Sequence, residues 1–194
     1  MVHLDRIYTR SGDDGTTSIG NGQRVSKLHP RIVAAGALDE LNSVIGVACS
    51  AVGETHLRKR LLAVQQLLFD AGADLCVPWS SDEAEGTVLR LESCVIAELE
   101  EWIDSLTAGL SPLRSFVLPG GNPSAASLHF ARSICRRAEL AVLSVQECEP
   151  GSVNTTLLIV LNRLSDLLFV LARCANDNGQ SDILWEPRRN NRMV

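Results

Sequence analysis

Apolar residues recur at three- and four-residue steps through most of the chain, a period that predicts amphipathic helices. The first pattern begins at Pro30, has its core stripe from Val33 onward and fades near Gly53. The second is ended by Pro78. Helices of about five to seven turns joined by short loops predict an all-α fold, an antiparallel five-helix bundle. The expected helices span residues 30–53, 57–75, 88–106, 123–149 and 157–175.

The chain is expected to form a single domain, 1–194, in three parts. Residues 1–28 are rich in Gly, Ser, Thr, Asn and Asp and lack a helical period, which predicts a Gly-rich loop that could include a short hairpin. Residues 30–177 form the bundle, and residues 178–194 form a tail. In the tail, 183–185 (Ile-Leu-Trp) could dock on the bundle, whereas 188–194 is expected to be disordered.

Composition and charge narrow the class of protein. With 45% hydrophobic but only 4% aromatic residues, the core must be built from aliphatic side chains, which suits interlocking helices. A formal net charge of −5 argues against nucleic-acid binding. The N-terminus lacks an apolar leader region, and Asn162, Arg163 and Asp166 interrupt the most apolar stretch, so no membrane association is expected. Six cysteines without a C-x-x-C pair are expected to be buried thiols of a cytoplasmic protein.

The predicted fourth helix carries a basic arc. His129, Arg132, Arg136 and Glu139 share one polar face beside the apolar stripe, and Arg137 lies on a neighbouring face. Two guanidiniums one turn apart suit a multiply charged oxyanion such as triphosphate. The alternative is a solvated face whose arginines pair with carboxylates of the bundle, and spacing alone does not decide between them.

The N-terminal segment 9–18 is a second candidate site. Its glycines leave backbone N–H groups accessible, and Arg24 and Lys27 follow it, so it could cradle phosphates. It has neither the Walker A nor the dinucleotide-binding spacing. A solvated tail is the alternative. Asp13 and Asp14 could contact magnesium, but adjacent aspartates in a Gly-rich segment more commonly form a turn.

Two single residues could have either a structural or a functional role. Asp39 lies off the predicted core stripe and could be an ordinary surface charge. Phe116 opens the apolar linker 116–121 and could simply anchor that loop.

Six segments, taken in order, resemble the successive motifs of the PduO-type ATP:cob(I)alamin adenosyltransferases. The resemblance covers most of the chain, and six motifs in sequence are far more specific than any one of them. Three positions depart from the family pattern, namely Asn122, Leu140 and Val160. The segments are Tyr8–Thr17, Arg24–Lys27, Asp39–Asn42, Phe116–Gly121, Ala131–Glu139 and Leu161–Asp166.

The resemblance implies a homotrimer of ferritin-like five-helix bundles with ATP sites between neighbouring subunits. Arg132 would pair with Asp39 across the interface. One subunit would bind ATP through Thr9, Arg10, Ser11, Gly12, Thr17, Ser18 and Lys27, and the other through Arg136, Arg137, Ala138, Glu139, Leu140 and Asn162.

The resemblance also implies the chemistry. Phe116 would lie beneath the corrin ring of cobalamin and exclude the lower axial ligand, leaving cobalt four-coordinate and easier to reduce. Cob(I)alamin would attack the 5′ carbon of ATP, triphosphate would leave, and Mg²⁺ would be held through the phosphates. Because cobalt is the nucleophile, no serine or cysteine nucleophile is required, and the protein positions the substrates and stabilises the leaving group.

Two other classes of function are compatible with a helical bundle. A di-metal protein of the ferritin-like kind is disfavoured, because the sequence contains no E-x-x-H. A non-catalytic carrier that hands adenosylcobalamin to a mutase would use the same residues, and only turnover separates it from the enzyme.

Overall fold

The computed structural model describes residues 8, 10–53 and 56–187 of the chain. The five predicted helices are all present. The N-terminal segment adds a two-stranded antiparallel hairpin, in which Thr16 pairs with Ser26 and Ser18 with Arg24. The elements are β1 (Thr16–Ser18), β2 (Arg24–Ser26), α1 (Pro30–Ala51), α2 (His56–Cys76), α3 (Cys94–Thr107), α4 (Pro123–Cys148) and α5 (Thr155–Ala175).

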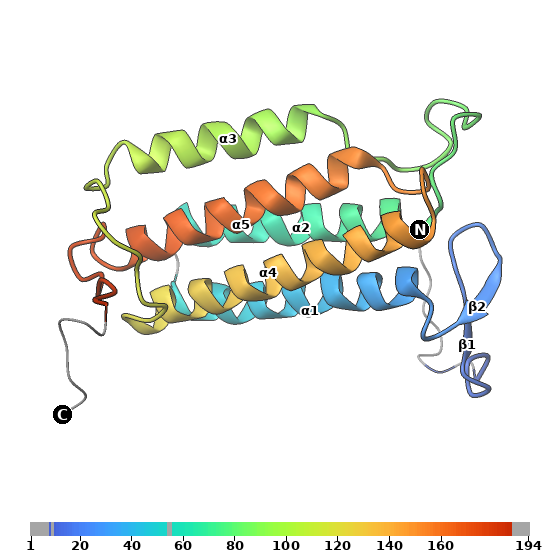
Figure 1. The fold of residues 1–194 in the computed structure, drawn as a ribbon, viewed down its shortest axis with the longest axis horizontal. Helices are drawn as coiled ribbons and strands as arrows, with labels where there is room; N and C mark the ends of the chain where they lie inside the picture. The colour runs from blue at the N-terminus through green and yellow to red at the C-terminus, as the bar shows by residue number, and fades with distance from the viewer. Residues whose placement is uncertain (1–7, 9, 54–55, 188–194) are drawn as a thin grey trace.

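Successive helices run antiparallel, as Figure 1 shows, and α1, α2, α4 and α5 surround the main core. Helix α3 packs on the outer side of α5, and these two helices run in the same direction. Their starts meet where Asn154 Nδ2 donates to Leu91 O at 3.0 Å, and their ends meet where Arg173 Nη2 donates to Ser111 O at 2.9 Å. The α3–α5 pair is parallel, as two odd-numbered helices of an antiparallel bundle must be.

The core is aliphatic, as the composition predicts. Fully buried alanines on α1 and α4 let these two helices pack closely, and α5 supplies most of the large side chains. Burial of each such leucine contributes about 1.5–3 kcal/mol to folding. The α5 leucines with no exposed surface are Leu157, Leu161, Leu164, Leu167 and Leu168.

Helices α1 and α5 are long and apolar enough by composition to cross a membrane. In this fold both pack against other helices, and each buries an arginine, Arg31 in α1 and Arg173 in α5. Their apolar character is thus used in the core of the bundle.

Three details of the sequence prediction are wrong. Val33 is 52% exposed, and the core stripe of α1 runs instead through Ala34 and Leu38. Helix α3 begins at Cys94 rather than residue 88 and has 14 residues, so it is shorter than five turns. The links 77–93 and 108–122 are longer than the short loops expected.

The cysteines also depart from expectation. Only Cys49 and Cys135 are buried among the described residues, while Cys94 and Cys148 are exposed. Burial raises the pKa of Cys135 to about 12, so this thiol stays protonated and unreactive.

A buried arginine joins α1 to the ends of α2 and α4. Arg31 is 1% exposed, and its guanidinium donates to Leu75 O at 2.6 Å and to Glu149 Oε2 at 2.6 Å. It also donates to Ser152 Oγ at 2.6 Å. Burial tends to raise the pKa of Glu149, but Arg31, Ser152 and His29 outweigh it and hold that pKa below its usual value. The stability contributed by this carboxylate is therefore present at neutral pH and is lost on acidification.

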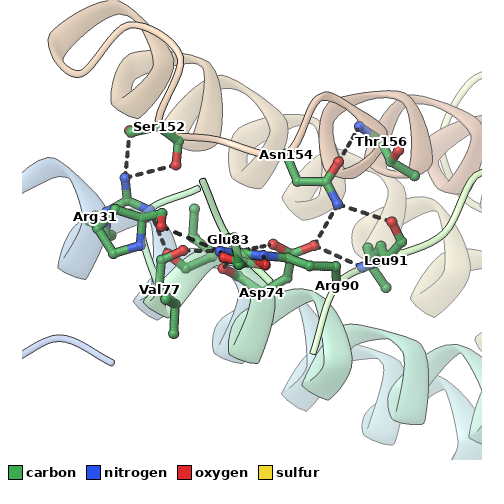
Figure 2. A network of polar contacts seen from close by, with 11 residues as sticks. Arg31, Asp74, Val77, Glu83, Arg90, Leu91, Ser152, Asn154 and Thr156 are labelled. Atoms are coloured by element: carbon green, nitrogen blue, oxygen red, sulfur yellow. Dashed lines mark hydrogen bonds and ion pairs between the residues drawn. The ribbon is translucent and has the colours of Figure 1, made fainter. Parts of the chain in front are cut away.

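A second buried charge fixes the link between α2 and α3 (Figure 2). Asp74 is 1% exposed and accepts hydrogen bonds from Arg90 Nη1 at 2.7 Å, Leu91 N at 2.8 Å and Asn154 Nδ2 at 2.7 Å. Arg90 is also paired with Glu83, and it donates to backbone carbonyl groups of the same link. Since Arg90 is held in this way, the chain from Val88 to Leu91 lies across the helix ends, and α3 starts later than its apolar pattern suggests.

The hairpin rests on this end of the bundle. Gly20 N donates to Cys76 O at 2.7 Å, directly after α2. A Cβ on Gly20 would lie 2.5 Å from Val77 Cγ2, so the close approach requires glycine. The two buried charges therefore support the surface that carries the N-terminal segment.

The first prediction concerns Asp74. Replacing it in Asp74→Ala removes the acceptor of three hydrogen bonds and leaves the buried Leu91 N without its partner, so the free energy of unfolding should fall by about 1–3 kcal/mol. Urea denaturation measures this change. The control is Glu100→Ala, which removes a 2.7 Å ion pair with Arg163 in which the glutamate is 49% exposed. That change should cost less than about 1 kcal/mol. Equal losses in the two variants would contradict the structural role of Asp74.

Candidate functional site

The candidate residues lie at three levels along the bundle. The hairpin lies beside the start of α1, and the linker that carries Phe116 lies at the opposite end (Figure 1). That end is fixed by Ser124 Oγ, which donates to Ala51 O at 2.8 Å, so the start of α4 meets the last residue of α1. With 22 residues, α1 separates the two ends by about 33 Å. The arginines of α4 lie between them.

The hairpin is held in shape by its own side chains. Asp14 accepts hydrogen bonds from Thr16 N at 3.0 Å and Thr16 Oγ1 at 2.7 Å, and Arg24 contacts Asp14 at 3.5 Å. The bonds from Thr16 and the charge of Arg24 lower the pKa of Asp14. Arg24 also donates to Ser11 O at 2.7 Å. Asp14 therefore forms the turn, in line with the more common role of such an aspartate.

Several predicted nucleotide contacts lie along this hairpin. Lys27 crosses Gly12, since a Cβ on Gly12 would lie 3.1 Å from the lysine Nζ. Arg10 adopts a positive φ of 59°, and its guanidinium lies 5.7 Å from the centre of the Tyr8 ring. Ser18 is exposed and Thr17 is half-buried. Thr9 lies outside the described residues.

Two arginines of α4 have no internal ion pair. Within the described part of the chain, neither Arg132 nor Arg136 makes a hydrogen bond or ion pair, and Arg132 Nε is buried without an acceptor. Asp39 is exposed on α1, likewise without a partner among those residues. The bundle thus leaves two cations and one anion available to groups outside this chain.

The neighbouring residues predicted to bind ATP already have partners within the bundle. Arg137 is paired with Glu40 of α1. Asn162 Nδ2 donates to Glu139 Oε1 at 3.1 Å, and Asn162 Oδ1 accepts from Arg163 Nη1 at 2.9 Å. These contacts fix the orientation of the side chains beside Arg136.

Two other predicted contacts differ sharply in exposure. Ala138 has no exposed surface, so its side chain is unavailable to a ligand. Leu140 is 65% exposed and presents an apolar surface on the same helix.

A cavity of about 660 Å³ opens at the linker end of the bundle. Phe116 projects at its wall with 78% of its surface exposed. Most of the lining is apolar, and its four polar side chains come in equal number from the linker and from α4. The lining residues are Leu113, Arg114, Ser115, Phe116, Val117, His129, Arg132, Phe169 and Trp185.

The C-terminal segment builds one side of this cavity. Trp185 N donates to Phe116 O at 2.7 Å, and Leu118 N donates to Ile183 O at 2.8 Å. The Phe116 and Trp185 rings meet edge to face, with centroids 6.2 Å apart. The predicted docking of 183–185 is confirmed, although the segment pairs with the linker rather than with a helix.

A buried ion pair holds this segment in place. Arg173 and Asp182 are 7% and 2% exposed at the side chain and pair at 2.8 Å.

Asn122 caps α4 by accepting from Ala125 N at 2.9 Å, and its Nδ2 donates to Ala175 O at 2.5 Å. The departure from the family pattern at Asn122 thus preserves a helix cap.

Sequence reasoning missed Phe169, Trp185 and the Arg173–Asp182 pair as parts of this site. Phe169 lies in the apolar pattern of α5 and Trp185 in a segment without periodicity, so no local signal marks them. Only their contacts across the fold bring them together.

A smaller hollow of about 340 Å³ lies on the α1–α2 face, with Asp39, Asn42, Phe69 and Cys76 in its lining. No group of three or more His, Cys, Asp or Glu side chains able to hold a metal ion occurs in residues 8, 10–53 and 56–187. The described residues therefore offer single charges rather than a metal cage.

The chain matches the family model of cobalamin adenosyltransferase over residues 7–175. The corrinoid adenosyltransferase of Mycobacterium tuberculosis is 47% identical over 188 residues, 96% of this chain and 95% of that protein. Corrinoid adenosyltransferase PduO of Salmonella typhimurium is 44% identical over 182 residues, 93% of this chain and 53% of that protein. The chain belongs to the cobalamin adenosyltransferase family.

Solved structures agree that the chain belongs to this family, and they indicate which type of adenosyltransferase it is. A phenylalanine-to-alanine variant of the PduO-type ATP:corrinoid adenosyltransferase from Lactobacillus reuteri, complexed with cobalamin and ATP, aligns with a TM-score of 0.85 at 38% identity. The alignment covers 94% of this chain and 100% of that one. An arginine-to-lysine variant complexed with ATP aligns with a TM-score of 0.83. Within the family the chain is of the PduO type, and it is an enzyme, an ATP:corrinoid adenosyltransferase.

The second prediction tests how the linker is held. Gly121 has a φ of +103°, and a Cβ there would lie 2.5 Å from Oδ1 of Asn176, which is 4% exposed. Gly121→Ala should therefore lower the free energy of unfolding by about 1–3 kcal/mol. It should also speed amide exchange at Leu118 and Trp185.

Gly120→Ala is the matched control, since a Cβ at Gly120 would have no neighbour within 4 Å. Its effect should stay within about 0.5 kcal/mol. Equal effects of the two substitutions on exchange would contradict the proposed packing of Gly121.

Proposed function

We propose that this protein transfers the 5′-deoxyadenosyl group of ATP to cob(I)alamin and releases triphosphate. The observation that carries the proposal is an apolar cavity at which Phe116 projects, beside a helix with two arginines that have no partner in the part of the chain the structure describes. The solved relatives bind cobalamin and ATP. The chemistry asks the protein to position two substrates and to stabilise a leaving anion.

Cobalamin would occupy the 660 Å³ cavity, with Phe116 against the lower face of the corrin ring. The Phe116 side chain is largely exposed, and its ring is held in place by the edge-to-face contact with Trp185. An apolar side chain in this position offers cobalt no lone pair and excludes water, which favours four-coordinate cobalt. Four-coordinate cob(II)alamin is easier to reduce, and the resulting cob(I)alamin is the nucleophile.

The triphosphate of ATP would lie against the basic face of α4. Arg136 has no partner among the described residues to compete for it, and the Glu139–Asn162 contact fixes the side chains beside it. A guanidinium placed where negative charge develops stabilises the departing triphosphate. From the hairpin, Lys27, Thr17, Ser18 and the backbone of 9–12 would complete the phosphate site. Mg²⁺ would be carried by the phosphates, since Asp14 is already engaged in the turn.

The active site would combine two subunits of a homotrimer. Within one chain the hairpin and the cavity lie at opposite ends of the bundle, about 33 Å apart by the length of α1. Cobalt and the 5′ carbon of ATP must meet at bonding distance, so a hairpin that binds this ATP has to come from a neighbour. The unpaired Asp39 and Arg132 would then pair across the interface.

The third prediction is a test of turnover. The protein, mixed anaerobically with ATP, Mg²⁺ and chemically reduced cobalamin, should convert the cob(I)alamin spectrum to that of adenosylcobalamin. Arg136→Ala should lower kcat/KM by about 100-fold or more, because the leaving triphosphate loses a charged contact. Lys59→Ala, on the exposed side of α2, should leave turnover unchanged. A wild-type protein that binds both substrates without conversion would be a carrier that passes cofactor to a mutase.

The fourth prediction tests the shared site. Lys27→Ala and Arg136→Ala should each be inactive alone. When equal amounts are denatured together and refolded as mixed trimers, about one site in four should regain both side chains, and about a quarter of wild-type activity should return. Each variant refolded by itself is the control. No recovery in the mixture, with trimers confirmed by mass, would place both residues in the same subunit's site.

We further propose a cytoplasmic location and use of the product by an adenosylcobalamin-dependent mutase. The sequence relationships to corrinoid adenosyltransferases support a role in corrinoid metabolism.

A further inference from the structure

His129 is an unusual side chain for a cavity wall. It is 2% exposed, lies on α4 and lines the same cavity as Phe116 and Trp185. Neither of its ring nitrogens has a hydrogen-bond partner among the described residues. Its ring meets Phe169 edge to face, with centroids 5.9 Å apart, so its orientation is set by packing.

A buried polar group without a partner costs about 1–3 kcal/mol. If the residue at this position had only a structural role, an apolar ring of similar size, such as that of Phe169, would give a more stable fold. The retained cost indicates that a partner for the imidazole arrives with a ligand of the cavity.

The charge state of the ring limits what that partner can be. Burial, and then the charge of Arg132, lower the pKa of His129, against a smaller opposing effect of Asp182. Arg132 and Arg114 also line this cavity, and Asp182 is paired with Arg173. The imidazole is therefore neutral at pH 7 and offers one N–H donor and one lone-pair acceptor.

We infer that His129 binds a peripheral carboxamide of the corrinoid and so positions the corrin ring over Phe116. A primary carboxamide carries both an acceptor oxygen and N–H donors, so it complements a neutral imidazole at both atoms. The edge of a corrin ring is lined with acetamide and propionamide groups. ATP is the weaker candidate, because Arg136, which we propose contacts its triphosphate, does not line this cavity, whereas His129 does. This inference rests on the proposed function, since it requires cobalamin in the cavity.

The test is corrinoid binding by the full-length protein. In the presence of ATP, His129→Phe should weaken binding of cob(II)alamin about 10-fold, and His129→Asn, which keeps a donor and an acceptor, should recover most of the loss. ATP affinity should not change. Absorbance titration measures the first and calorimetry the second. The four-coordinate signature of bound cob(II)alamin should persist at saturation, because Phe116 is intact.

Stability provides a readout that separates a ligand contact from a structural role. Without ligand, His129→Phe should unfold at the same or higher urea concentration than wild type, since two unpaired nitrogens are removed. Lower stability together with unchanged corrinoid affinity would overturn the inference and make His129 a structural residue.

A second experiment uses modified cobalamins with the wild-type protein and does not depend on the folding of a variant. Cobalamins in which one peripheral carboxamide has been hydrolysed to a carboxylate should bind wild type unequally, and one regioisomer should lose about 10-fold. That preference should vanish in His129→Phe, whose side chain has no donor or acceptor to distinguish an amide from a carboxylate. Equal affinity of wild type for all regioisomers would contradict the inference. Wild type that turns over cobalamin normally would show that only the inference has failed, whereas absence of turnover would count against the proposed function itself.

Discussion

Two buried charges at one end of the bundle fix the positions of the helix ends relative to one another, and the rest of the structure depends on them. Arg31 joins α1 to the ends of α2 and α4, and Asp74 joins α2 to the starts of α3 and α5. A buried ion of this kind is stabilising only while every partner is present, because its desolvation is costly. The same contacts fix the surface under Gly20, so the position of the N-terminal hairpin depends on charges that never contact a substrate.

The length of the bundle sets the second constraint. Helices of more than 20 residues place the hairpin and the cavity at opposite ends of one chain. If the hairpin binds ATP and the cavity binds cobalamin, as we propose, an interface between subunits would bring them together without any large motion, because each chain could present its hairpin to a neighbour. The exposed Asp39, and Arg132 with its buried unpaired Nε, are consistent with such an arrangement, since both are left without partners in the described chain.

The helices were predictable because burial imposes a period on them, and the resemblance identified the motifs. Errors arose where neighbouring apolar residues make the period ambiguous, as with Val33 beside Ala34, or where a distant contact overrides it, as with Arg90 before α3. Arg31 beside a helix start reads as a solvated residue, yet it is buried by groups 44 to 121 positions away. Trp185 reaches the site through bonds to residues about 70 positions earlier, and no local pattern encodes such a contact.

The cavity also shows how a site differs energetically from a core. At the hairpin end, most polar atoms of the buried network have a partner within the chain, while Arg31 Nε and Glu149 Oε1 have no hydrogen-bond partner among the described residues. At the cavity, His129 and Arg132 retain nitrogens without partners in the described residues, so the cost of their burial remains in the unliganded fold. Whatever supplies those partners binds only the folded state and must stabilise it by mass action. If cobalamin or a neighbouring subunit supplies these partners, as we propose, its binding would also complete the polar contacts at this end of the fold.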